Sequence, residues 1–148
     1  MKILVAYDGT LQAKKALAYG IGKAKEKNAA LIVQHVFNAW AFKDYDASLT
    51  AETAARSECA RFLSEAEAMI KDKGLKASIV TMDGDPEKEV VAFAKEEGVD
   101  ILLCPPKYRS VIARYQKALE KEGRAVNTTE LADAAQLTLA AVVAGRKN

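Results

Sequence analysis

The chain has few of the residues that build metal centres and disulfide frameworks. Its 148 residues include two cysteines, one histidine and one tryptophan. Cys59 and Cys104 lie far apart in the sequence, so they match neither a disulfide framework nor a zinc-binding spacing. This cysteine usage excludes a disulfide-rich secreted scaffold, and it predicts a reducing, cytoplasmic setting.

Long apolar runs are also missing. The run Ile3–Tyr7 is too short for a membrane span or for the apolar core of a signal peptide. The chain carries 22 lysines and arginines against 20 acidic residues, a formal net charge of +2. Such a balanced charge gives no signal for nucleic acid or a membrane surface, and we expect neither as a partner.

Signatures of catalysis are absent as well. The sequence contains no serine, histidine and acid in the order of a hydrolase triad, no metal-ligand cluster and no Walker-type glycine loop. We therefore assign no catalytic and no metal-binding residue. His35 has no partner that the sequence indicates, and Cys59 lies on the apolar stripe of a predicted helix, as expected of an inert core thiol.

The chain begins with a predicted strand that is followed directly by a turn. Ile3–Tyr7 is apolar on both alternating faces, which is typical of a strand buried on both sides of a sheet. Asp8, Gly9 and Thr10 then form a turn and a helix start, so Asp8 lies at the carboxyl end of the strand. Ligands bind at that end in open parallel sheets, which makes Asp8 the first candidate binding residue.

The rest of the chain alternates between helical and strand patterns, and its length suits one domain. The apolar spacing predicts helices over 11–27 and 50–73, from Pro86 to Gly98 and from Lys107 to Gly123, and strands over Ala29–Phe37, Leu75–Met82, Val99–Cys104 and Leu137–Ala144. Asn127 or Thr128 would cap a further short helix. Trp40, Phe42 and Tyr45 fall in a predicted loop, where we expect them to cover the core. The whole predicts a three-layer α/β sandwich around a five-stranded parallel sheet.

Several of these stretches resemble the universal stress protein family. They are Ile3–Thr10, Ala16 to Ala24, Leu31–Val36 with its His-Val pair, Gly84-Asp85-Pro86 and Asp100–Cys104. The resemblance implies a parallel sheet in the order 3-2-1-4-5 and a homodimer through strand 5, Leu137–Ala144. It also implies an ATP site where Asp8 lies beside Cys104. There Asp8, with Gly9 and Thr10 in its turn, contacts the nucleoside, and Val36 lines the adenine pocket.

The family's phosphate loop is not kept. Its first glycine aligns with Pro105, its second with Tyr108, and its third falls near Asn127 after a longer spacer. Proline has no N–H to aim at an anion, and Tyr108 brings a Cβ and bulk where the backbone must approach a phosphate. Side-chain donors that could replace part of the loop are Lys107, Arg109, Ser110, Thr128 and Thr129.

Three functions remain open at this point. The first is a homodimeric stress-response domain without ATP or another cofactor, which acts through protein contacts. The second is an ATP- and magnesium-binding member of the family that works as a switch or as a slow ATPase. The third is a phosphoacceptor receiver domain using Asp83 or Asp85, which is disfavoured because Asp8 stands alone where receivers carry two acids.

Overall fold

The structure is a computed structural model that describes residues 1–39, 48–133 and 136–144. Its elements, in chain order, are β1 (Lys2–Ala6), α1 (Leu11–Lys27), β2 (Ala30–Phe37), α2 (Ser48–Asp72), β3 (Ala77–Asp83), α3 (Pro86–Glu97), β4 (Ile101–Cys104), a short 3₁₀ helix (Pro106–Tyr108), α4 (Arg109–Lys121), β5 (Val126–Asp133) and β6 (Gln136–Val143). The loop aromatics Trp40, Phe42 and Tyr45 lie outside the described residues.

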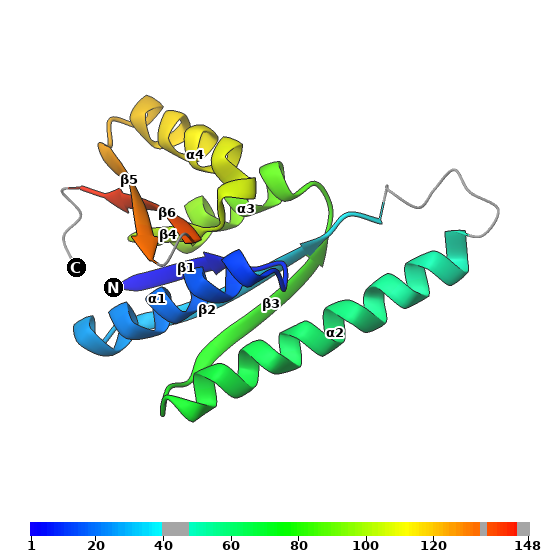
Figure 1. The fold of residues 1–148 in the computed structure, drawn as a ribbon. Coiled ribbons are helices and arrows are strands. Elements are labelled where there is room, and N and C mark those ends of the chain that lie inside the picture. The colour runs from blue at the N-terminus through cyan, green and yellow to red at the C-terminus, as the bar shows by residue number, and fades with distance from the viewer. Residues whose placement is uncertain (40–47, 134–135, 145–148) are drawn as a thin grey trace.

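The strands form one six-stranded sheet in the order β3-β2-β1-β4-β6-β5 (Figure 1). Strand β1 pairs in parallel with β2 on one side and with β4 on the other. The prediction that the first strand and the strand ending at Cys104 are central neighbours is therefore confirmed. Apolar side chains on both faces of these two strands explain the placement, since both faces are covered.

The expected five-stranded, fully parallel sheet is wrong in its last part. The segment beginning Asn127-Thr128-Thr129 is not a helix but part of β5, which pairs with β6 from Val126↔Val143 to Asp133↔Gln136. Strand β6 in turn runs antiparallel to β4. The predicted fifth strand, Leu137–Ala144, is thus an inner strand and not the sheet edge, because a hairpin partner covers it.

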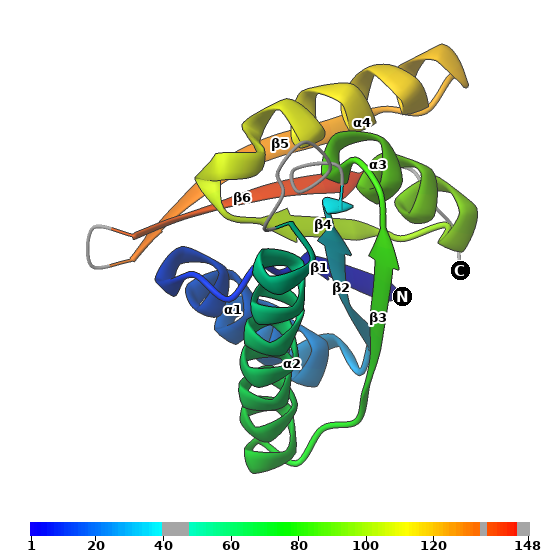
Figure 2. The same ribbon diagram turned by 90° about the vertical axis from the view of Figure 1, so that its right-hand side faces the viewer.

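Helices cover both faces of the sheet, which gives three layers (Figures 1 and 2). Ile3 and Val5 point to the side of α1 and α2, whereas Leu4 and Ala6 point to the side of α3 and α4. The alternation of β1 therefore divides the core into two apolar layers, one on each face. None of the described helices combines the length and the apolar character needed to cross a membrane.

The hairpin β5–β6 extends past the end of β4. Cys104, the last residue of β4, pairs with Leu139, while β6 already begins at Gln136. The three residues before Leu139 add roughly 10 Å of strand at about 3.3 Å a residue. This part of the hairpin projects beyond the carboxyl end of β4 (Figure 2), the end of the sheet at which Asp8 lies.

Candidate functional site

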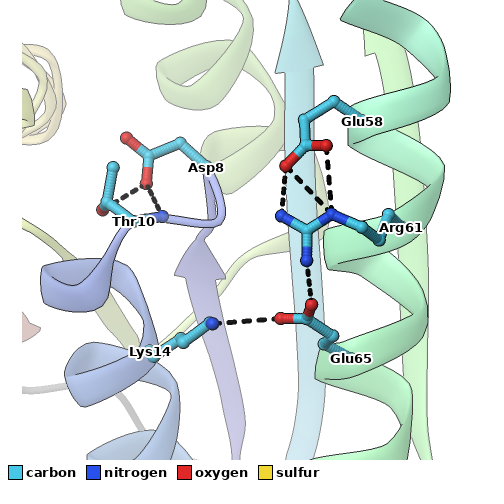
Figure 3. Close-up of polar contacts among 6 residues, drawn as sticks. All are labelled: Asp8, Thr10, Lys14, Glu58, Arg61 and Glu65. Atoms are coloured by element: carbon cyan, nitrogen blue, oxygen red, sulfur yellow. Dashed lines mark hydrogen bonds and ion pairs between the residues drawn. The ribbon is translucent and has the colours of Figure 1, made fainter.

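Asp8 is held in place by the turn that links β1 to α1. Thr10 caps α1, since its Oγ1 accepts a hydrogen bond from the backbone N–H of Ala13 at 3.1 Å. The Thr10 hydroxyl donates to Asp8 Oδ1 at 2.6 Å, and the Thr10 backbone N–H donates to the same oxygen at 3.1 Å (Figure 3). The carboxylate therefore has one oxygen engaged by its own turn and one that points elsewhere.

The second oxygen, Asp8 Oδ2, lies near a side chain of the segment that follows β4. Asp8 Oδ2 is buried and accepts no hydrogen bond within the described residues, and Lys107 Nζ lies 3.5 Å from it. The Asp8 side chain is 7% exposed, whereas that of Lys107 is 67% exposed. A buried carboxylate thus faces a solvent-exposed cation across the carboxyl ends of β1 and β4, at the end of the sheet where ligand binding was predicted.

Apolar packing fills the rest of this region. Val36 and Cys104 are buried in the core layer under α3 and α4, and Tyr108 packs against the same cluster. The Cys104 thiol approaches the Tyr108 carbonyl at 3.8 Å, and burial raises its pKa to about 12. Burial also raises the pKa of Tyr108, and nearby Asp8 adds to that shift. At the position of the family's second loop glycine, the chain therefore presents a half-buried ring.

Two of the predicted phosphate donors are engaged in other contacts. Arg109 forms an ion pair with Glu130 on β5. Ser110 donates its hydroxyl to Glu87 Oε1 at 2.5 Å, in the first turn of α3. Neither contact is made with Asp8, so of the predicted basic side chains it is Lys107 that the structure brings to the carboxylate.

The structure places Asn127, Thr128 and Thr129 away from the crevice. All three lie on β5, which is separated from β1 by β6 and β4. Three strand spacings of about 4.8 Å put them on the order of 14 Å from the line of β1. Thr128 and Thr129 line a groove of about 240 Å³ between β5 and α4, together with Arg109. The predicted short helix capped by Asn127 or Thr128 is wrong, because these residues belong to a strand.

The acids considered as receiver phosphoacceptors have structural partners. Asp83 accepts a two-pronged pair of hydrogen bonds from Arg56, at 2.8 and 3.1 Å. Asp85 caps α3 by accepting the backbone N–H of Glu87 at 3.1 Å. These contacts account for both carboxylates as parts of the fold.

Ion pairs next to Asp8 tie α1 to α2. Lys14 on α1 lies 3.0 Å from Glu65 on α2, and Arg61 bridges Glu65 and Glu58 along α2 (Figure 3). These side chains are largely solvent-exposed, so each pair contributes little to stability. The sequence alone does not indicate this network, because only the packing of α2 beside α1 brings Lys14 and Glu65 together.

A pairing of His35 with Cys59 was also missed. His35 Nδ1 lies 2.9 Å from the Tyr7 carbonyl, and its Nε2 lies 3.2 Å from the Cys59 thiol. His35 is on β2 and Cys59 is on α2. The apolar pattern around Cys59 indicated a core position, and nothing in it showed which strand residue would lie opposite.

The structure is an α/β domain in which Asp8 and Lys107 meet at the switch point between β1 and β4. The model of the Universal stress protein family matches residues 1–116. A universal stress protein of Bacillus subtilis, YxiE, is 29% identical over 114 residues, which cover 69% of this chain and 76% of the relative. The chain belongs to the universal stress protein family, as its sequence motifs indicated.

Solved structures agree with this assignment. A universal stress family protein from Burkholderia pseudomallei has a TM-score of 0.65 and 26% identity, covering 80% of this chain and 89% of its own. A universal stress protein from Archaeoglobus fulgidus in complex with dAMP has a TM-score of 0.60 and 21% identity, covering 78% and 88%. The family match ends inside α4, so the hairpin β5–β6 lies outside the matched residues.

Proposed function

We propose that this chain is a stress-response regulatory domain that acts through protein contacts and does not use ATP. The Asp8 crevice would instead accept adenosine or an adenine nucleotide with a single phosphate. The observation that carries the proposal is the Asp8–Lys107 pair, which sets one carboxylate for a ribose next to one cation for a phosphate.

The backbone after β4 supports a ligand with no more than one phosphate. Pro105 and Pro106 provide no amide for an anion, and Tyr108 packs where the family has a loop glycine. Of the predicted basic groups, Lys107 is the one that lies at Asp8, whereas Arg109 pairs with Glu130 on β5. A hydrogen bond to a charged group is worth about 1.5–3 kcal/mol, so two lost contacts weaken triphosphate binding roughly a hundredfold or more.

A protein of the same fold supports the ligand class. The Archaeoglobus fulgidus protein of the same fold is described in complex with dAMP, an adenine nucleotide with a single phosphate. The second candidate function is an ATP-dependent switch or slow ATPase. It would require Lys107 and other side chains to replace the glycine loop.

We further propose that the domain works as a homodimer in the cytoplasm. Two features support these points. Val142 on β6 is an exposed apolar residue, 38% accessible, next to the outer strand β5. Both cysteines are free thiols, as in reducing compartments.

Titration calorimetry with adenosine, AMP and Mg-ATP tests the ligand proposal. We expect AMP to bind at least about tenfold more tightly than Mg-ATP. Lys107→Ala should weaken AMP more than adenosine, since adenosine has no phosphate for the ammonium to meet, and Asp8→Asn should weaken both. Arg109→Ala is the matched control, because Arg109 is held by Glu130 and should have no effect on AMP.

Two results would contradict the proposal. A dissociation constant for Mg-ATP of about 10 μM or tighter, lost in Lys107→Ala and Asp8→Ala, would establish the ATP-binding function. No binding of any of the three ligands at millimolar concentration would remove the nucleoside site and leave protein contacts alone.

A further inference from the structure

We propose that Cys59 and His35 form a reactive thiol site that is alkylated by small α,β-unsaturated carbonyl compounds, with His35 as the general base. The site lies on the α1/α2 side of the sheet, whereas Val36 points to the opposite side. The proposal does not rest on the function proposed for the Asp8 site, although the charges of Asp8 and Lys107 act on His35.

The Tyr7 carbonyl determines the tautomer of His35. A carbonyl oxygen can only accept a hydrogen bond, so the contact of 2.9 Å requires a proton on His35 Nδ1. In the neutral ring Nε2 is then an acceptor, and it lies 3.2 Å from Cys59 Sγ. The thiol accordingly donates its proton toward Nε2. This is the arrangement of a nucleophile, a base and a group that orients the base.

Burial keeps His35 in its neutral form, in which Nε2 can accept a proton. The residue is 8% exposed, and its ring packs edge-on against Phe62 at 5.0 Å. Burial lowers the pKa of His35, while the hydrogen bond to Tyr7 and the charge of Asp8 raise it and the charge of Lys107 lowers it further. The net shift is downward, so the imidazole is neutral at neutral pH.

The thiol is protonated at rest. Burial raises the pKa of Cys59, the charge of Arg56 lowers it, and the charge of Glu58 raises it. The resting pair is therefore a neutral thiol on a neutral imidazole, and not a thiolate. Such a pair gains reactivity only when an electrophile is close enough for the S–H proton to move to His35.

A pocket of about 300 Å³ gives an electrophile access to this pair. It lies between α2 and the ends of β2 and β3. Phe37 and Leu63 line its apolar side, and Arg56 and Thr81 are polar members beside His35 and Cys59. The volume is at the lower end for ligand pockets, which suits a small organic molecule.

Polar groups in the pocket suit a carbonyl oxygen. Arg56 is held by Asp83 and lies over the Phe37 ring, 4.2 Å from its centroid. Its guanidinium and the Thr81 hydroxyl are hydrogen-bond donors on the same lining as the thiol. An enone or enal would thus place its apolar part on the hydrophobic lining and its oxygen toward donors.

The reaction needs no further reactant. Cys59 Sγ attacks the β-carbon of the unsaturated carbonyl while its proton passes to His35 Nε2. The C=C electron pair moves onto the carbonyl as an enolate, and the enolate takes the proton back at its α-carbon. A thioether forms, His35 returns to its neutral state, and no electron is gained or lost overall.

Cys104 is an internal reference for this chemistry. Its side chain is fully buried, its pKa is raised to about 12, and its polar contact is a carbonyl oxygen at 3.8 Å. Within the described residues no basic side chain hydrogen-bonds to its thiol, and the thiol is shielded from solvent, so it should remain unmodified under conditions in which Cys59 reacts.

The full chain treated with methyl vinyl ketone, followed by peptide mass spectrometry, tests the proposal. We expect an adduct on Cys59 and none on Cys104. The rate constant should be unchanged in Cys104→Ser and should fall by at least about tenfold in His35→Gln, since general-base assistance is worth about 10²–10⁴-fold. In concentrated urea the wild type and His35→Gln should react at the same rate.

The pH dependence of the alkylation rate constant of the wild type distinguishes a general base from a structural role for His35. The rate constant should rise through the pKa of His35, below 6.5, and then level off near neutral pH. Equal rates for folded wild type and folded His35→Gln would overturn the proposal, as would a profile that rises only above pH 9. Oxidation of Cys59 by hydrogen peroxide without any ketone adduct would also overturn it, in favour of a peroxide site.

Discussion

The ring of Phe62, in α2, occupies the space where a Cβ atom on Gly9 would lie. Such an atom would stand 2.4 Å from two carbons of the ring, and Gly9 has a φ of +78° that side chains rarely adopt. The turn that carries Asp8 is therefore packed directly under α2. Any residue other than glycine at this position would disturb both the turn and the helix.

Gly9→Ala should be clearly more destabilising than Gly123→Ala. Both glycines have a φ of +78°, but a Cβ on Gly123 would meet nothing within 4 Å. The left-handed conformation costs about 1–2 kcal/mol, and the clash with Phe62 adds about 1–3 kcal/mol at Gly9. Urea unfolding of both variants measures the difference, and equal losses would show that Phe62 moves aside without cost.

The two glycines of α1 should respond to alanine in opposite directions. A Cβ on Gly20 would come within 2.9 Å of a Val5 methyl group, whereas one on Gly22 would meet nothing within 4 Å. We expect Gly22→Ala to stabilise by about 0.5–1 kcal/mol through helix propensity, and Gly20→Ala to destabilise by about 1–3 kcal/mol. Thermal and urea unfolding check both; stabilisation by Gly20→Ala would contradict the close packing of α1 on β1.

Stability should decrease on mild acidification, and His35 should account for part of the loss. Because burial lowers the pKa of His35 in the folded state, the unfolded chain binds more protons below pH 6.5. The contribution of neutral His35 to the free energy of unfolding is complete above about pH 6.5. It is lost as the pH falls through the lower pKa that His35 has in the folded state. Urea unfolding between about pH 8 and pH 5 should show a shallower pH dependence for His35→Gln than for the wild type. Parallel curves would refute this assignment.

Val142→Lys should weaken the proposed homodimer. Val142 is exposed beside β5, and a charge there would have to be desolvated in an interface. Leu11→Lys is the control, because Leu11 is another exposed apolar residue but lies on α1. Light scattering at micromolar concentration should show a dimer for the wild type and for Leu11→Lys. A monomeric wild type would reject the dimer, and an unaffected Val142→Lys variant would place the interface elsewhere.

Much of the first part of the chain could be predicted from local patterns. Strands apolar on both faces had to be central, which placed β1 next to β4 and Asp8 at their carboxyl ends. The helix starts at Thr10 and just before Pro86 were recognisable because capping depends on residues three or fewer positions away. Capping and the apolar character of a strand are local, so the sequence was sufficient to determine them, whereas the order of the strands was implied by the family resemblance.

The region after α4 could not be determined in the same way. Asn127-Thr128-Thr129-Glu130 suits a helix start, yet β-branched threonines also suit a strand, and the pairing of β5 with β6 decided between the two. Likewise, Lys107 could have pointed anywhere until it met Asp8, and Cys59 had no partner until α2 packed over His35. The sequence by itself determined which segments are apolar and where each local turn begins. The tertiary structure decided which distant side chains meet, because such contacts depend on the packing of whole helices and strands and not on their spacing in the chain.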